Sequence, residues 1–294
     1  MDDATAPYEE APPGPLVGPD WLAARLGRPG LRVFDASVGA HRGAPVRIPG
    51  ARPFDLDGAL SAPGAPLPHT MPDAARFTEE MRALGLHDGD TAVVYDAAGL
   101  YSAARGWWML RAMGFDRVAV LDGGLPGWTA AGLPVEEGAP GGPPERGDFT
   151  AVERPGLFVD ADEVAAALTD PSAAVFDARS RERFRGTAPE PRPGLRGGHM
   201  PGAVSLPFTE VQHGGRMRPA AELRALFDAL APDRSRLLFS CGSGVTACVP
   251  ALAAELAGRG GTAVYDGSWS EWGLPSEDRP VATDDGERAG DPSA

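Results

Sequence analysis

The chain has 294 residues, of which 43% are hydrophobic and 23% charged, enough to build two folded domains with buried cores. Its 41 acidic residues outnumber its 27 basic ones, and the formal net charge of −14 argues against a nucleic-acid-binding protein, which needs a cationic surface. The chain has arginine but no lysine, which excludes a lysine Schiff base and a phosphate-binding loop of the Walker type.

Residues 1–15 are acidic and rich in proline, so they predict a flexible tail rather than a signal peptide. No stretch approaches the roughly 18 uninterrupted apolar residues that a membrane-spanning helix requires. The two cysteines, Cys241 and Cys248, are too few for a disulfide framework and do not form a four-ligand zinc pattern. We therefore expect a cytoplasmic protein with reduced thiols.

Further along the chain, short apolar runs alternate with helical patterns. The runs are bounded by turn residues and predict buried strands. Residues 105–113 and 247–256 predict helices, which Gly114 and Gly258 terminate. Residues 138–148 (GAPGGPPERGD) favour neither a helix nor a strand and predict a linker, and residues 281–294 predict a second flexible tail.

The two halves of the chain repeat each other. Five segments of the first half recur 142 to 152 residues later. The matching pairs are 32–37 and 174–179, 48–51 and 200–203, 92–96 and 237–241, 120–124 and 264–268, and Trp128 and Trp272. So long a period indicates a duplicated domain. We predict an α/β protein with two tandem domains, 16–137 and 149–280, each a mostly parallel sheet flanked by helices.

The halves differ after the third apolar run. The first half has Asp96 there, whereas the second has Cys241, followed by a glycine-rich loop. A cysteine at the carboxyl end of a buried parallel strand lies where α/β folds bind ligands. Loop amides and the start of the next helix favour an anionic thiolate. We predict that Cys241 is a nucleophile, the alternative being an inert buried thiol, and that Cys248 is a packing residue.

A second difference is a local excess of positive charge. Residues 179–196 contain six arginines and two glutamates, a net charge of +4 in an acidic chain. The arginines are Arg179, Arg181, Arg183, Arg185, Arg192 and Arg196. This pattern predicts capture of a small anion such as a carboxylate, with Arg179 and some of the others in ordinary ion pairs.

These residues resemble the tandem-domain rhodanese family over about residues 16–280. The loop CGSGVTA, 241–247, is similar to that of the 3-mercaptopyruvate sulfurtransferases. The related thiosulfate sulfurtransferases usually have Arg and Lys where this chain has Gly242 and Ser243. The segments 183–192, 198–203 and 265–273 are also similar to the family.

The resemblance implies transfer of sulfur from mercaptopyruvate through a persulfide on Cys241, with release of pyruvate and no metal or organic cofactor. Arg183 and Arg192 would hold the carboxylate and keto group of the donor, and Ser243 would polarise it or relay a proton. The remaining loop residues expected to contact the substrate are Gly242, Gly244, Val245 and Thr246.

The resemblance also implies that Asp57 and His69, in the first half, support Ser243. The alternative for His69 is a surface histidine in the proline-rich segment 62–72. The sulfur acceptor would be a thiol, such as thioredoxin or glutathione, or cyanide.

Three other functions remain open at this stage. A thiosulfate sulfurtransferase could use the same scaffold, although the loop lacks the two cations that suit a divalent donor. A cysteine phosphatase also wraps a loop around an anion, but such loops end in an arginine and this chain has Ala247 there. The third is a non-catalytic sulfur carrier or interaction module, which the first half resembles because Asp96 cannot hold sulfur.

Overall fold

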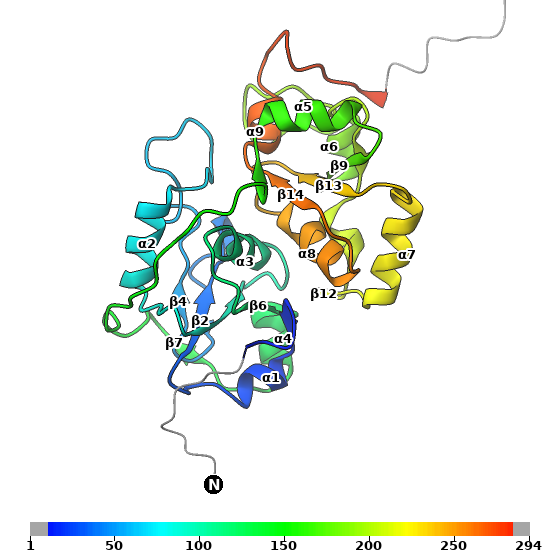
Figure 1. Cartoon of the computed structure of the whole chain (residues 1–294). Helices are drawn as coiled ribbons and strands as arrows, with labels where there is room; N and C mark the ends of the chain where they lie inside the picture. The colour runs from blue at the N-terminus through cyan, green and yellow to red at the C-terminus, as the bar shows by residue number, and fades with distance from the viewer. Residues whose placement is uncertain (1–10, 285–294) are drawn as a thin grey trace, which may run out of the picture. The chain divides into compact units, whose positions relative to one another are not determined.

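The computed structural model describes residues 11–284, which form two compact units (Figure 1). Within the described residues, the first unit comprises 11–157 and 212–218, and the second comprises 158–211 and 219–284. No helix among residues 11–284 is both long and apolar enough to cross a membrane.

The first unit is built on a parallel five-stranded sheet in the order β1-β6-β5-β2-β4. Its strands are β1 (Leu16–Val17), β2 (Leu31–Asp35), β4 (Arg52–Pro53), β5 (Thr91–Tyr95) and β6 (Val118–Leu121). Its helices are α1 (Pro19–Ala23), α2 (Ala74–Ala83), α3 (Ala103–Ala112) and α4 (Gly124–Ala130), with a 3-10 turn, Gly39–His41. Two antiparallel pairs complete it: β3 (Val46–Arg47) with β7 (Glu136–Glu137), and β11 (Gln212–His213) with β12 (Arg216–Met217).

The second unit has a parallel five-stranded sheet in the order β10-β9-β13-β14-β8. Its strands are β8 (Phe158–Val159), β9 (Ala173–Asp177), β10 (Val204–Ser205), β13 (Arg236–Ser240) and β14 (Thr262–Tyr265). Its helices are α5 (Ala161–Thr169), α6 (Arg181–Arg185), α7 (Ala220–Leu230), α8 (Cys248–Leu256) and α9 (Ser268–Trp272), with a 3-10 turn, Phe208–Val211.

The two sheets have the same strand order. Read from the first strand of each unit, β1-β6-β5-β2-β4 corresponds to β8-β14-β13-β9-β10. Strands whose sequences repeat each other occupy equivalent places in the two sheets, so the duplication predicted from the sequence is present in the fold. The predicted fold class, two α/β units with parallel sheets flanked by helices, is confirmed.

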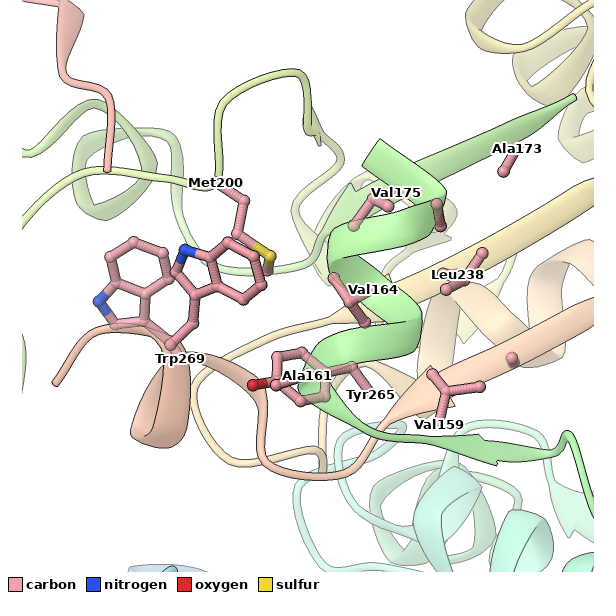
Figure 2. Close-up of a cluster of buried hydrophobic side chains, with 12 residues drawn as sticks. Val159, Ala161, Val164, Ala173, Val175, Met200, Leu238, Tyr265 and Trp269 are labelled. Atoms are coloured by element: carbon pink, nitrogen blue, oxygen red, sulfur yellow. The ribbon is translucent and has the colours of Figure 1, made fainter. Parts of the chain in front are cut away.

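Alternation along the strands of the second unit divides its core between the two faces of the sheet. On one face, Val175 and Leu238 pack with Val164 of α5 and Trp269 of α9 (Figure 2). On the other face, Phe176 and Phe239 stack at a ring-centroid distance of 5.4 Å, and Phe227 of α7 meets both edge-on. Burial on both faces fixes the register of β9 and β13, the two strands that precede the functional loops.

Three local boundaries differ from the sequence-based prediction. The predicted helices 105–113 and 247–256 are observed as Ala103–Ala112 and Cys248–Leu256. The predicted linker 138–148 packs against the first unit, where Arg52 Nη1 donates to the carbonyl oxygens of Gly141 and Gly142. The boundary between the units follows Leu157 instead. The segment has no helix or strand, as expected, and arginine side chains bind its backbone oxygens.

The ends of the chain differ from the prediction in part. Of the predicted tails, 1–15 and 281–294, residues 1–10 and 285–294 lie outside the described residues. Within 281–294, Ala282 forms an antiparallel bridge with His199, and the two backbones exchange hydrogen bonds of 2.9 Å. The segment 212–218, predicted to belong to the second domain, is part of the first unit: Gln212 Nε2 donates to the carbonyl oxygen of Leu100 at 2.7 Å.

Candidate active site

Cys241 follows β13 directly, at the carboxyl end of a central parallel strand, and only 2% of it is exposed. The start of α9 holds its backbone in place. The N–H of Cys241 donates to Ser268 Oγ at 3.1 Å, and its carbonyl oxygen accepts from the N–H of Trp269 at 3.0 Å. The carbonyl oxygen of Gly242 accepts from both the N–H and the Oγ–H of Ser270, at 2.8 and 2.7 Å. The thiol is therefore presented by a fixed backbone.

The loop that follows Cys241 is compact and mostly buried. Gly244 has φ +75°, a left-handed conformation that glycine adopts at little cost, and it turns the chain towards α8. Ser243 and Val245 are 7% and 4% exposed. Helix α8 begins at Cys248, so the loop joins a strand end to a helix start as predicted. Cys248 is fully buried and its thiol donates to the carbonyl oxygen of Gly244, which agrees with a packing role.

Two arginine side chains meet at the loop. A Cβ atom built onto Gly242 would lie 3.2 Å from Nη2 of Arg183 and 3.8 Å from Nη1 of Arg192. Arg183 extends from α6, which follows the carboxyl end of β9, the strand paired with β13. Because parallel strands end at one edge of a sheet, α6 and the Cys241 loop lie together. The structure thus brings Cys241, Arg183 and Arg192 to one place.

Most arginines of the predicted cationic segment have fixed partners within the structure. Arg181 pairs with Glu210 and Arg185 with Asp284, and Arg196 donates to backbone carbonyl oxygens such as that of Trp272. Arg179 is fully buried, binds Asp177 and Glu190, and stacks its guanidinium 3.9 Å from the ring centroid of Trp269. This agrees with the structural role predicted for Arg179.

Arg183 and Arg192 differ in their partners. Arg183 pairs with Glu190 at 2.5 Å, whereas Arg192 has no ion pair with any residue of 11–284. Within the described part of the chain, no carboxylate therefore offsets the charge of the Arg192 guanidinium, which can bind an anion at the loop.

The first unit brings Asp57 and His69 together. His69 Nε2 lies 2.9 Å from Oδ1 of Asp57, and Oδ2 of Asp57 accepts from the N–H of Gly39 at 2.8 Å. Burial opposes ionisation of this carboxyl, but those two bonds and the charges of His69 and Arg42 hold the pKa of Asp57 below its usual value of 3.8. His69 is thus a partnered side chain rather than a free surface histidine. A role for this pair in catalysis stays a prediction.

In the first unit, Asp96 occupies the position that corresponds to Cys241. Its carboxylate is fully buried and accepts hydrogen bonds from five backbone N–H groups at 2.8 to 3.0 Å. The donors are Ala98, Gly99, Tyr101, Ser102 and Ala103. The loop after β5 therefore surrounds an anion that the chain itself supplies.

Three residues of the site were not identified from the sequence: Glu190, Ser268 and Ser270. The two serines lie in the segment 265–273, which was matched to the family as a whole without singling out either serine. Glu190 lies between Arg183 and Arg192 and was counted only as a charge. Its buried position, with 2% of the side chain exposed, is set by tertiary packing that a local pattern does not reveal.

Residues 11–284 contain no group of three or more His, Cys, Asp or Glu side chains that could hold a metal ion. The arrangement at Cys241 consists of a buried thiol at the start of a compact loop and two guanidinium groups. Such a set can bind a small anion and attack it with sulfur.

Comparison with known proteins gives a consistent result. A family model described as "Rhodanese-like domain" matches twice, at residues 18–131 and 160–274. The 3-mercaptopyruvate sulfurtransferase of Escherichia coli (strain K12) is 40% identical over 277 residues, covering 90% of this chain and 97% of that protein. The human 3-mercaptopyruvate sulfurtransferase is 38% identical over 273 residues, covering 92% and 88%.

A plant relative and a solved structure extend the comparison. A thiosulfate/3-mercaptopyruvate sulfurtransferase of Arabidopsis thaliana is 39% identical over 288 residues, covering 88% of this chain and 76% of that protein. The crystal structure of SseA from Escherichia coli, described as having the "Rhodanese" fold, matches with a TM-score of 0.77 at 38% identity. The match covers 87% of this chain and 99% of that one.

Proposed function

The chain belongs to the rhodanese-like family and is a sulfurtransferase, and we propose that it takes sulfur from 3-mercaptopyruvate through a persulfide on Cys241. The observation that carries this proposal is the approach of Arg183 and Arg192 to Gly242, next to the thiol. Mercaptopyruvate has a carboxylate and a keto oxygen on adjacent carbons, and both accept hydrogen bonds from guanidinium groups. Two arginines at one loop match these two acceptors.

The proposed reaction begins with the Cys241 thiolate. It attacks the donor sulfur, an S–S bond forms, and the carbon–sulfur bond breaks with its electrons passing to the keto oxygen as an enolate. Protonation of the enolate carbon releases pyruvate. Overall, one thiol and mercaptopyruvate give one persulfide and pyruvate, with no net oxidation. Guanidinium groups at the keto oxygen stabilise the charge that develops there.

Ser243 is the proposed proton relay, because it lies two residues from Cys241 and is 7% exposed. The Asp57–His69 pair is proposed to support the proton transfer, an assignment that rests on the resemblance to the family. Gly242, Gly244, Val245 and Thr246 are proposed to supply backbone donors for the outer sulfur of the persulfide. The five N–H bonds to Asp96 in the first unit support this, because they illustrate how the corresponding loop surrounds an anion.

The proposed acceptor is a small thiol or a protein thiol such as glutathione or thioredoxin, or cyanide. We place the reaction in the cytoplasm, where a reducing environment keeps thiols free. Both cysteines are free thiols in the structure, in agreement with that setting.

Mass spectrometry of the intact protein tests the proposal. After incubation with mercaptopyruvate and removal of excess donor, we expect a mass gain of one sulfur atom that maps to Cys241 and is lost on adding a thiol. The variant Cys241→Ser should gain nothing, whereas Cys248→Ala should load like the wild type. Loading by thiosulfate but not by mercaptopyruvate would contradict the proposed donor, and no loading by either would contradict sulfur transfer through Cys241.

A further inference from the structure

The carboxylate of Glu190 forms ion pairs with two arginines, Arg179 and Arg183. Its Oε1 accepts from Nη1 of Arg179 at 2.7 Å and from Nε of Arg183 at 3.2 Å, and its Oε2 accepts from Nη2 of Arg183 at 2.5 Å. Only 2% of the Glu190 side chain is exposed. A buried carboxylate with three charged donors is strongly held and has a fixed position.

The charges around Glu190 balance in pairs. Arg179 is already matched by Asp177, with contacts of 2.6 to 3.0 Å from Nε and Nη2. The negative charge of Glu190 therefore offsets Arg183. Among the six arginines of the segment 179–196, this leaves Arg192 as the guanidinium at Gly242 whose charge is not offset by a carboxylate of the described residues.

This pairing changes what Arg183 can offer a substrate. Its Nε–H and one N–H of Nη2 point to Glu190, while Nη2 also lies beside Gly242. Arg183 can still donate hydrogen bonds from its remaining N–H groups, but as half of an ion pair. The two arginines together thus present many donors and one unbalanced positive charge.

We propose that Glu190 is a specificity-determining residue, which limits the pair Arg183 and Arg192 to one net positive charge and so favours a donor with a single carboxylate over a dianion such as thiosulfate. The inference rests on the proposed function, since it concerns the donor of the same Cys241 loop. One guanidinium without a carboxylate partner matches the single carboxylate of mercaptopyruvate, whereas a dianion would be bound with one charge unpaired, beside the Cys241 thiolate, in a partly desolvated place.

The variant Glu190→Gln tests this inference, because it keeps the size and an acceptor oxygen but removes the charge. The measurement is kcat/KM with mercaptopyruvate and with thiosulfate, at one cyanide concentration. We expect the kcat/KM for thiosulfate, divided by that for mercaptopyruvate, to rise roughly tenfold. Removing the negative charge of Glu190 adds one net positive charge to the arginine pair, and this charge attracts a dianion more strongly than a monoanion.

Glu182→Gln is the matched control. Glu182 belongs to the same segment, carries the same charge, and is fully solvent-exposed in α6. It changes the net charge of the chain by the same amount, so the ratio should stay at the wild-type value. Glu190→Asp keeps the charge but shortens the side chain, and should lower both kcat/KM values while leaving their ratio within about threefold of wild type.

The outcomes separate this inference from the proposed function. Failure of the wild-type protein to transfer sulfur from mercaptopyruvate overturns the proposed function whatever the variants do. A wild type that is active with mercaptopyruvate, combined with equal ratios for Glu190→Gln and Glu182→Gln, overturns the role of Glu190 alone.

A measurement on the wild-type protein covers the case in which Glu190→Gln does not fold. Sulfate and methanesulfonate share a tetrahedral headgroup but carry two charges and one charge. As competitive inhibitors against mercaptopyruvate, they should have inhibition constants within about threefold of each other if the arginine pair carries one net positive charge. Binding of sulfate more than about threefold tighter than that of methanesulfonate would overturn the proposal.

Discussion

Arg183 packs against Gly242 so closely that a Cβ atom at position 242 would lie 3.2 Å from Nη2 of the arginine. The glycine has an ordinary backbone conformation, because its φ lies outside the left-handed region. A side chain at position 242 would therefore require the Arg183 guanidinium to shift by a few tenths of an ångström.

The variant Gly242→Ala tests this relationship. The added methyl group should push the Arg183 guanidinium away from the loop. We expect kcat/KM for mercaptopyruvate to fall by about tenfold or more, because a misplaced binding group stabilises the transition state less. Steady-state kinetics with both donors provide the measurement.

Gly260→Ala is the control for that substitution. A Cβ atom at Gly260 meets nothing within 4 Å, and its φ is also ordinary. The control should keep wild-type kinetics. If Gly242→Ala also keeps them, the contact with Arg183 does not position the donor.

The second prediction concerns Asp96. Replacing it with asparagine removes the charge and turns an amide NH₂ towards a ring of five N–H donors. We expect the free energy of unfolding to fall by about 2 kcal/mol or more, because buried donors lose a charged acceptor. Urea denaturation measures the change. Asp233→Asn, an exposed aspartate of the second unit, should change stability by less than about 0.5 kcal/mol; equal effects would contradict the role given to Asp96.

The third prediction compares a buried and an exposed ion pair. Arg179→Gln leaves Asp177 without its cation in a place where both side chains are fully buried, and should destabilise the protein by about 3 kcal/mol. Arg181→Gln breaks a pair whose side chains are 46% and 37% exposed, and should cost less than about 1 kcal/mol. Thermal or urea unfolding of the two variants gives the comparison, and a similar loss in both would refute it.

The fourth prediction follows from the lowered pKa of Asp57. Because the folded-state pKa lies below the usual value of 3.8, ionised Asp57 stabilises the fold above pH 3.8, and this contribution is lost as the pH falls through the folded-state pKa. Asp57→Asn should therefore be less stable than wild type at pH 6, and the difference should shrink as the pH falls below 3.8. Urea titrations across that range measure it.

The comparison variant for Asp57 is Asp122→Asn. Burial raises the pKa of Asp122, although the N–H of Met217 and the charge of Arg216 oppose the rise. Ionising Asp122 therefore costs stability above its usual pKa of 3.8. Its pH dependence should have the opposite sign to that of Asp57, with the asparagine variant gaining on wild type as the pH rises. The same sign in both would contradict the electrostatic argument.

Much of the fold was predictable because repetition and apolar runs are properties of the sequence itself. The strands that precede Cys241 and Asp96 were predicted from their apolar residues. The nucleophilic role of Cys241 was predicted from the glycine-rich loop that follows it. Arg183 and Arg192 were singled out by their motif, and the structure brings both to Gly242.

The features that escaped prediction depend on distant contacts. The segment 138–148 looked like a linker because glycine and proline form neither helix nor strand, yet Arg47 and Arg52 donate to its carbonyl oxygens. Glu190 was counted in the sequence only as a charge, and its burial beside Arg179 and Arg183 is visible only in the folded structure. Local propensity cannot report a partner that lies far along the chain.

The carboxylate of Asp96 has a consequence for how much sulfur one molecule can store. Two copies of the fold suggest two loading positions, but the first copy holds its own acid permanently in the loop where a thiol would be needed. A chain saturated with donor should thus contain one equivalent of sulfane sulfur, not two. Duplication of the fold therefore does not double the amount of sulfur that one chain should carry.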